Sequence, residues 1–421
     1  MSPQFPQATK DLSTLGINEM VASSEAAEVL SASATIEVTD TAFWCSESSA
    51  SVNGSTVEVE TYVSGASTVS VIGIRRVTGS LPITSAYLHL DGIEIVAYCE
   101  DTDLSLLDQA KHFHPNAGFY DNVNDLIDKQ DFDIAWVVLP AVEVPNVGIK
   151  LANAGKHFYM EKQFARTSAE LFDLAKAIQK NEVKVLPGYP HRFNPVAQDL
   201  KTMTLDGVFG RIIDVEVRMV TGQVKPGLRE PTSFLYTDKD EGGGILHMLG
   251  GHHLEVMRFL MNCEVKSVQA MTGRPIGIIE EPLEDIAIAA FEYENGAFGS
   301  MHAGYLQSAK GGYDTSLVIR GTDGEANWTP IGESELKVKS ASPKWTDSPE
   351  RKFEYTFSPS PPGYTSGGKW MFNWVQNFIN DIQNGRELEV TVIDALRVLQ
   401  TIDSAYESAR TGKRVEIEYL I

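Results

Sequence analysis

Two segments of the chain contain residue types that can move a proton, and the first is built around Glu161 and Lys162. Both follow an apolar run typical of a buried parallel strand, in the stretch GKHFYMEKQFA of residues 155–165. In an open α/β sheet, ligands bind outside the carboxyl ends of the strands. A lysine there can hold a substrate hydroxyl and lower its pKa. The alternative is an ordinary surface Glu-Lys pair.

The second segment is EGGGILHMLGGHHLEVMRFL, residues 241–260. Its glycines allow a close approach of the backbone to another group and predict the start of a helix. His252 lies four residues after Met248 on one helix face, and a histidine in a cleft is suited to accept the proton when hydride leaves a carbinol carbon. Helical geometry places His247 about 140° around the axis from His252, so we predict no metal site. Structural histidines are the alternative for each, including His253.

A glycine turn near residue 73 is similar to a nucleotide-binding fingerprint, with two departures. The run Val69–Ile72 predicts a strand that leads into Gly73, and a dinucleotide-binding turn then reads G-x-G-x-x-G. Arg75 replaces the second glycine, and Gly79 stands one place later than the third. Because arginine can pair with a phosphate, we expect a shifted diphosphate contact rather than none. The predicted cofactor contacts in this turn are Gly73, Ile74, Arg75 and Arg76.

Glu100 is placed to choose between two forms of such a cofactor. It ends the second predicted strand, 27 residues after Gly73. An acid at that point can hydrogen-bond an adenosine ribose and would repel a 2′-phosphate. The position therefore favours NAD over NADP, the alternative being a solvated loop acid.

Alternating strands and helices must position these residues in the first half of the chain. A capping-box spacing at residues 167–170 predicts the start of one of the helices. Alternation of this kind is typical of a doubly wound parallel sheet. The predicted strands are Val69–Ile72, Gly92–Cys99, Ile134–Pro140, Lys156–Met160 and Val183–Leu186.

After about residue 190 the pattern changes to strands joined by short turns, which favours an open, mostly antiparallel sheet in a second α/β domain. Two helices are predicted near the end, the first with a core-facing stripe of apolar residues four apart. The predicted strands are Arg211–Val220, Ile286–Tyr293, Phe298–Tyr305 and Leu317–Arg320. The predicted helices are Lys369–Gln383, with Trp370, Trp374, Phe378 and Ile382 in its stripe, and Val392–Thr411.

Composition excludes some classes of partner. The 421 residues carry a net charge of −22, which argues against nucleic acid or an anionic membrane surface. There is no apolar run of about 18 residues and no basic segment followed by an apolar one at the N-terminus, so we expect neither a membrane helix nor a signal peptide. Three cysteines without a C-x-x-C pair fit a reducing compartment, and we expect a cytoplasmic protein.

The same patterns divide the chain into three parts. Residues 1–66 form an extension of unknown role with one basic residue and nine acids, typical of a solvated acidic face. Within it, residues 23–34 predict a short helix and residues 55–63 a strand. Residues 67–188 form the predicted nucleotide-binding domain, and residues 189–421 form the predicted domain for substrate and oligomer contacts.

Taken together and in this order, the motifs resemble the glucose–fructose oxidoreductase / inositol dehydrogenase (Gfo/Idh/MocA) family. The resemblance covers about residues 67–421. It implies a Rossmann domain, a C-terminal domain whose sheet packs on another subunit in a homo-dimer or homo-tetramer, and NAD(P)-dependent hydride transfer on a sugar, cyclitol or related polyol. The stretches that carry it are VIGIRRVTG with IEIVAYCED, GKHFYMEKQFA, YPHRFNPVAQDL, GGGILHMLGGHHLE and ALRVLQTIDSAYESARTGKRVEI.

The resemblance also implies roles for single residues. Lys162 and His252 match the catalytic lysine and histidine of the family. Leu139 and Pro140 match a pair along the nicotinamide, and Glu161 joins the cofactor contacts. The implied substrate contacts at the domain junction are Tyr189, His191, Arg192, Asn194, Met248 and His253.

This chain departs from the family pattern at several of these places. Val144 replaces a histidine, Gln163 stands where the motif has proline, and Met248 replaces an aspartate four residues before the catalytic histidine. Two alternatives to a simple dehydrogenase therefore stay open. One is an NAD-using lyase or glycoside-cleaving enzyme that oxidises its substrate transiently. The other is a non-catalytic sensor or regulator with the same fold.

Overall fold

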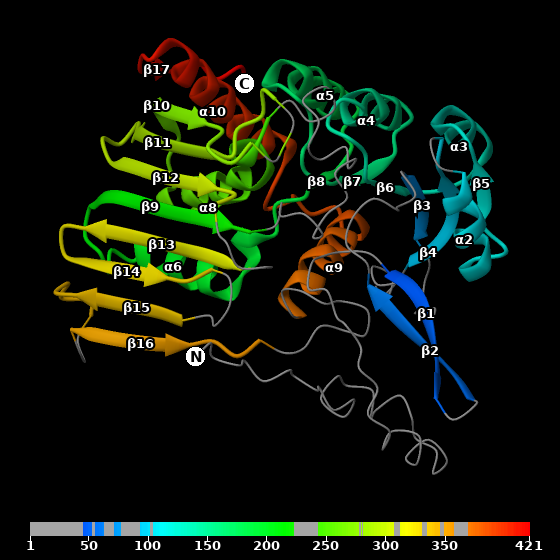
Figure 1. Ribbon diagram of the computed structural model, residues 1–421, viewed down its shortest axis with the longest axis horizontal. Coiled ribbons are helices and arrows are strands. Elements are labelled where there is room, and N and C mark those ends of the chain that lie inside the picture. Colours follow the sequence, from blue (N-terminus) through cyan, green and yellow to red (C-terminus); the bar gives the residue numbers. More distant parts are fainter. Residues whose placement is uncertain are drawn as a thin grey trace.

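Two large β-sheets flanked by helices form most of the part of the chain that the computed structural model describes (Figure 1). The description covers residues 45–52, 55–62, 71–76, 93–101, 104–222, 243–277, 279, 281–306, 312–330, 335–345, 349–357 and 369–421. The helix predicted in residues 23–34 and the predicted turn glycine Gly79 lie outside these ranges. A separate antiparallel hairpin of β1 (Cys45–Val52) and β2 (Ser55–Tyr62) confirms the strand predicted from residue 55.

The first sheet has six strands in the order β5-β4-β3-β6-β7-β8, which is the order of a dinucleotide-binding fold. Five of the strands share one direction, and helices connect them. The four predicted strands after the first are confirmed. The strands are β3 (Val71–Arg76), β4 (Ile93–Cys99), β5 (Gly118–Tyr120), β6 (Ile134–Val137), β7 (His157–Met160) and β8 (Val185–Pro187), and the helices are α2 (Ser105–Phe113), α3 (Val123–Lys129), α4 (Val144–Asn153) and α5 (Ser168–Lys180).

Strand β3 differs from the prediction in both extent and direction. It continues through Gly73 to Arg76, and it runs antiparallel to its neighbours β4 and β6. Its register against β4 shifts between Gly73 and Ile74, the kind of bulge that a glycine within a strand permits. Val71 pairs with Cys99 at the carboxyl end of β4, whereas Arg76 pairs with Ile93 at the amino end.

This geometry corrects the predicted diphosphate turn. Gly73, Ile74, Arg75 and Arg76 lie within an extended strand, because extended backbone continues where a turn was expected. They run away from the sheet edge at which the parallel strands end, so the structure does not join them to Glu100 at one cofactor edge.

Local sequence signals set the ends of the helices as predicted. The Thr167 side chain accepts a hydrogen bond of 3.3 Å from the Glu170 backbone N–H at the start of α5. α9 spans Lys369–Gln383 and α10 spans Val392–Thr411, both with the predicted bounds. α10 ends at Gly412, whose φ of 68° is the left-handed conformation that glycine adopts easily.

The second sheet is mixed and open. Its nine strands lie in the order β16-β15-β14-β13-β9-β12-β11-β10-β17, and all neighbouring pairs are antiparallel except β9 with β12. The predicted hairpin of residues 286–305 is confirmed as β11 and β12. The strands are β9 (Ile212–Thr221), β10 (Val265–Gly273), β11 (Ile286–Tyr293), β12 (Phe298–Gly304), β13 (Tyr313–Gly321), β14 (Gly324–Trp328), β15 (Glu335–Ser340), β16 (Glu350–Glu354) and β17 (Val415–Glu416).

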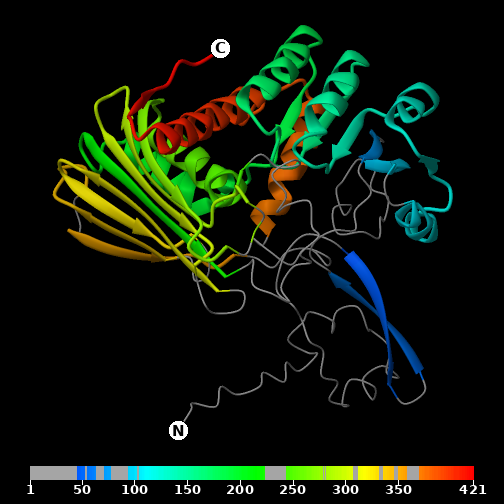
Figure 2. The same cartoon turned by 45° about the horizontal axis from the view of Figure 1, so that its top comes forward.

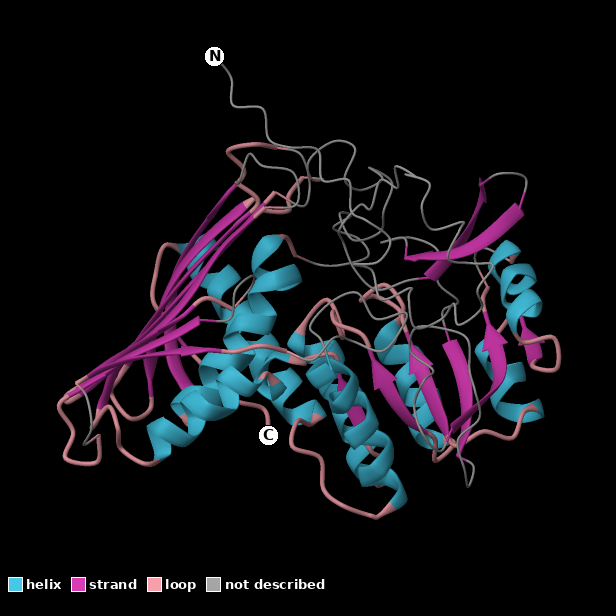
Figure 3. Cartoon of the chain, turned by 90° about the horizontal axis from the view of Figure 1, so that it is seen from below, coloured by secondary structure: helices cyan, strands magenta, loops and turns pink. Residues whose placement is uncertain are grey.

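Helices cover one face of this second sheet (Figure 3). α8 (Gly251–Met261) packs on β9, and α10 packs on β10. Side chains along β11 and β15 alternate between buried and more exposed positions, as a sheet with one covered face requires. The uncovered face carries the apolar side chains of Met271, Ile288 and Phe298.

The two sheets meet where α10 runs from the large sheet to α5 (Figure 2). The Ser168 backbone N–H at the start of α5 donates a hydrogen bond of 2.8 Å to the Asp403 carboxylate on α10. α10 also contacts β8 and α8. This junction brings the carboxyl ends of β7 and β8 next to the start of α8. None of the helices in the described ranges is long and apolar enough to cross a membrane.

Candidate active site

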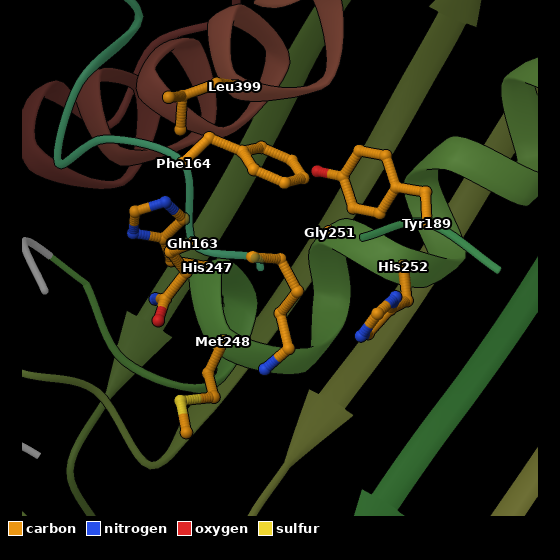
Figure 4. Close-up of a pocket in the computed structure, with 9 residues that line it drawn as sticks. Gln163, Phe164, Tyr189, His247, Met248, Gly251, His252 and Leu399 are labelled. Atoms are coloured by element: carbon orange, nitrogen blue, oxygen red, sulfur yellow. The ribbon is translucent and has the colours of Figure 1, made fainter. Parts of the chain in front are cut away.

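A small pocket at this junction is lined by side chains from the domain of the first sheet and from the domain of the second (Figure 4). Four of the residues that the sequence assigns to the site line it, namely Lys162, Tyr189, Met248 and His252. The other lining residues, which sequence reasoning did not place in the site, are Gln163, Phe164, His247, Gly251 and Leu399.

Lys162 enters the pocket from the loop that directly follows β7. The Glu161 backbone N–H donates to the Val137 carbonyl at 2.9 Å, which ties this loop to β6. The Glu161 carboxylate accepts a hydrogen bond from the Tyr159 hydroxyl, and it does not line the pocket. Burial raises the pKa of Glu161, and the nearby charge of Lys162 opposes that rise. Glu161 thus supports the loop that presents Lys162, and the Lys162–Gln163 peptide bond is cis.

His252 lies at the start of α8, directly after a π-helical turn, η5 (Leu246–Gly250). The start of that turn is held by Glu284, whose carboxylate accepts hydrogen bonds of 2.9 Å from the backbone N–H groups of Gly244 and Leu246. The Tyr406 hydroxyl on α10 donates a third hydrogen bond, also 2.9 Å, to the same carboxylate. These contacts fix the helix that carries His252.

The glycines before this turn allow the close approach that the sequence predicted, and the group approached is the protein itself. A Cβ atom on Gly244 would lie 2.6 Å from the Glu284 backbone nitrogen, and one on Gly243 would lie 2.5 Å from the Tyr406 hydroxyl. Neither position has room for a side chain, so both glycines serve the packing of the helix that carries His252.

The π-helical turn also corrects the predicted separation of His247 and His252. The predicted angle assumes a regular α-helix, whereas His247 lies in the π-helical turn and His252 on the helix that follows it. Both histidines line the same pocket. No group of three or more histidine, cysteine, aspartate or glutamate side chains in the described ranges could hold a metal ion.

Aromatic rings and imidazoles surround His252. Its ring centroid lies 5.0 Å from that of His191 and 5.7 Å from that of Tyr189. Burial, followed by the charges of His191, Lys162 and His253, lowers the pKa of His252 well below the usual value for histidine. The ring is therefore neutral at pH 7, and its Nδ1 atom has no hydrogen-bond partner within the described part of the chain. A neutral imidazole beside a lysine can accept a proton from a hydroxyl that the lysine holds.

His191 and His253 form a layer around His252 and do not line the pocket. Burial, with a smaller contribution from His253, lowers the pKa of His191 to about 3. Burial also lowers the pKa of His253, whose Nδ1 atom lies 3.2 Å from the Leu249 carbonyl oxygen. Both rings are neutral at pH 7, and they pack against each other with their ring centroids 5.9 Å apart.

Two of the residues predicted to contact substrate have other partners. The Arg192 guanidinium donates hydrogen bonds to the Glu255 carboxylate at 2.6 Å and to the Glu389 carbonyl at 2.7 Å, and it forms an ion pair with Asp394 at 3.2 Å. Asn194 accepts a hydrogen bond of 2.9 Å from the Val196 backbone N–H and caps the helix that follows it. Neither residue lines the pocket, so the structure places them in the support of the junction.

The remaining predicted cofactor residues share one edge of the first sheet. Glu100 follows β4, Leu139 and Pro140 follow β6, and Lys162 follows β7. The strands before them run in the same direction, so their carboxyl ends lie at one edge. The buried acid Glu100 and the Leu139–Pro140 segment at this edge fit the ribose and nicotinamide parts of a dinucleotide. Strand β3 does not bring a glycine turn to this edge.

Comparison with known families agrees with this architecture. Residues 68–189 match the model described as "Oxidoreductase family, NAD-binding Rossmann fold", and residues 197–327 match the "GFO/IDH/MocA C-terminal domain". The two matches together span more than half of the chain. The protein belongs to the Gfo/Idh/MocA family of oxidoreductases, whose N-terminal domain is an NAD-binding Rossmann domain.

Two relatives that match most of this chain are 24% and 23% identical to it. D-apiose dehydrogenase from Paraburkholderia graminis is 24% identical, over 80% of this chain and 86% of the relative. The scyllo-inositol 2-dehydrogenase (NAD(+)) of Bacillus subtilis is 23% identical, over 70% of this chain and 80% of the relative. Among solved structures, levoglucosan dehydrogenase in complex with NADH and levoglucosan superimposes with a TM-score of 0.69 at 21% identity, over 77% of this chain and 90% of that one. This last likeness establishes the fold.

Proposed function

We propose that this protein is an NAD-dependent dehydrogenase that oxidises a CH–OH group of a sugar, cyclitol or related polyol, or reduces the corresponding carbonyl. The observation that carries the proposal is the meeting of Lys162 and His252, from different domains, in one pocket. The relatives named above are dehydrogenases of a sugar and of an inositol, which supports the same substrate class.

The two residues divide the proton chemistry between them. The Lys162 ammonium group donates a hydrogen bond to the reacting hydroxyl and stabilises negative charge as it develops on the oxygen. Neutral His252 accepts the hydroxyl proton, and the low pKa of His252 keeps it ready to do so at pH 7. When bound, the nicotinamide supplies the hydride acceptor. Tyr189 and Met248 shape the wall against which the rest of the substrate packs.

The cofactor preference rests on Glu100. A buried acid directly after β4 accepts hydrogen bonds from a ribose and repels a 2′-phosphate, which favours NAD over NADP. We assign residues 67–188 to cofactor binding and residues 189–421 to substrate binding and assembly. We also propose a cytoplasmic location, in keeping with the cysteine usage, and no nucleic-acid or membrane partner, in keeping with the net charge of −22.

The open face of the second sheet supports a homo-dimer or homo-tetramer. Met271, Ile288 and Phe298 are 75%, 51% and 59% exposed, and they lie on the neighbouring strands β10, β11 and β12. A second copy of the chain would cover these apolar side chains. We expect Ile288→Lys to shift the protein towards monomer in light scattering after gel filtration. Leu205→Lys, which changes an exposed leucine at the end of α6 (Pro195–Leu205) instead, is the control and leaves the assembly unchanged.

The first experiment is titration of the protein with NAD and NADP, followed by assays of NADH formation on a panel of sugars and cyclitols. We expect tighter binding of NAD than of NADP and turnover on at least one panel member. Lys162→Ala lowers kcat/KM by about 10²–10⁴-fold, the usual size of such a contribution, whereas Lys180→Ala on the exposed end of α5 does not. Unchanged turnover in Lys162→Ala on every accepted substrate would refute the assignment. Substrate cleavage without net NADH formation would instead indicate transient oxidation.

A further inference from the structure

Gln163 has a buried side-chain amide without a partner. The residue is 3% exposed and follows Lys162 in the loop after β7. Neither its Oε1 atom nor its Nε2 atom has a hydrogen-bond partner among the described residues. Its side chain lines the same pocket as Lys162 and His252. In the view of Figure 4, Gln163, His247 and Met248 lie on one side of the pocket and Tyr189 and His252 on the other.

A primary amide that is buried in this way carries a free-energy cost, because it has given up water on both of its polar atoms. Phe164, Met248 and Leu399, which line the same pocket, have no strong hydrogen-bonding group. The polar side chains of the pocket, those of Lys162, Tyr189, His247 and His252, form no hydrogen bond with the amide. A ligand in the pocket can recover that cost. The amide provides two N–H donors and one carbonyl acceptor, and a hydroxyl group can both accept from it and donate to it.

The charges of the pocket indicate which group of a ligand would hydrogen-bond the Gln163 amide. Among the described residues that line the pocket there is no carboxylate, and Lys162 supplies a positive charge. Lys162 is engaged by the reacting hydroxyl in the proposed function. The neutral amide of Gln163, which is next to it in the chain, is matched to a second, neutral hydroxyl on the same molecule.

We propose that Gln163 is a specificity-determining residue that hydrogen-bonds the hydroxyl on the carbon next to the reacting carbon, so that the pocket selects vicinal diols over mono-alcohols. This inference rests on the proposed polyol dehydrogenase function. It assigns to the chain a preference that neither Lys162 nor His252 provides, because both act on the reacting hydroxyl.

The test compares substrates that differ by that one hydroxyl. The pairs are D-glucose with 2-deoxy-D-glucose, D-ribose with 2-deoxy-D-ribose, and myo-inositol with a deoxyinositol. Gln163→Met keeps a side chain of similar length and removes the amide. We expect it to lower kcat/KM by about tenfold for the hydroxylated member of an accepted pair and to leave the deoxy member unchanged. The affinity for NADH stays at the wild-type value.

Two further variants make the result specific. Gln163→Asn keeps the amide but withdraws it by one carbon, so it also loses activity on the hydroxylated member only. Gln179→Met, at an exposed position of α5, changes neither member. An equal loss on both members of every pair, or no loss on either, overturns the inference.

Binding measurements separate this inference from the proposed function. If the wild type forms no NADH on any sugar, the dehydrogenase proposal fails, and calorimetric titration of the protein with the same pairs then decides the role of Gln163. The wild type must bind a hydroxylated member more tightly than its deoxy partner, and Gln163→Met must abolish that difference. Equal binding of the two members, or no binding of either, rejects the inference.

Discussion

The position of Gly244 makes its replacement by alanine a stringent test of how the helix that carries His252 is held. A Cβ atom there would lie 2.6 Å from the Glu284 backbone nitrogen and 2.6 Å from the Glu284 Oε2 atom, and it would also clash with the Glu284 carbonyl oxygen. Two of these three atoms belong to the backbone just before β11, which cannot rotate away as a side chain can.

The expected loss in the free energy of unfolding has two contributions. Forcing an extra carbon into a packed site costs about 1–3 kcal/mol. Weakening the hydrogen bonds from the N–H groups of Gly244 and Leu246 to the Glu284 carboxylate adds about 1–2 kcal/mol. We therefore expect Gly244→Ala to lower the free energy of unfolding by about 2–5 kcal/mol. Because His252 is carried by the helix that starts here, kcat/KM also falls by about tenfold or more.

Urea denaturation followed by tryptophan fluorescence measures the first quantity, and initial rates of NADH formation measure the second. The matched control is Gly273→Ala at the end of β10, where a Cβ atom would come no closer than 3.5 Å to its neighbours. We expect the free energy of unfolding of this control to lie within about 0.5 kcal/mol of the wild-type value. A similarly small change in Gly244→Ala would show that Glu284 does not fix the helix in the way described.

Two further predictions concern buried charge. Glu255→Gln removes a fully buried carboxylate that pairs with Arg192, so we expect the free energy of unfolding, measured by urea denaturation, to fall by about 3–5 kcal/mol. The Arg192→Met/Glu255→Leu double variant removes both partners, so its free energy of unfolding falls by less. Equal losses in the two variants would contradict the pairing. The second prediction uses His191, His252 and His253, whose pKa values are all lowered by burial. Below pH ~6.5 these histidines bind protons in the unfolded state but stay neutral in the folded state. The free energy of unfolding therefore falls as the pH drops below that value. We expect His191→Phe to reduce the difference in urea midpoint between pH 7.5 and pH 5.5, and an unchanged difference would count against it.

The sequence was sufficient for those elements and site residues that depend on local patterns. The bounds of α9 and α10 follow from apolar spacing and from the end signals Thr391 and Gly412, all within a few residues of one another. Lys162 and His252 were found in the same way, because each follows a recognisable run of residues. Gln163 and Phe164 directly follow Lys162, so their presence in the pocket had a signal that went unused.

Other features depend on contacts between distant segments, and no local pattern carries them. Arg192 was predicted to touch substrate, yet its partners Glu255 and Asp394 lie 63 and 202 residues further along the chain. Leu399 reaches the pocket from α10, more than 230 residues after Lys162 in the chain, and nothing in its own stretch assigns it to the site. The direction of β3 was also out of reach, because side chains alternate with the same period in parallel and antiparallel strands.

The glycine-rich segment before His252 shows that a motif can predict a close approach of the backbone without identifying the group that is approached. The glycines do permit a close approach, but it is made by Glu284 and Tyr406 and not by a ligand. Glu284 precedes β11 and Tyr406 lies on α10, so a single carboxylate links the large sheet, the last helix and the turn that carries Met248. That turn carries His247 and Met248, and His252 follows it on α8; all three residues line one pocket. In the proposed mechanism, the position of His252 is set by the packing of Glu284 and Tyr406 against the glycines that precede it, and variants at Gly244 or Glu284 are expected to alter catalysis without touching any reacting atom.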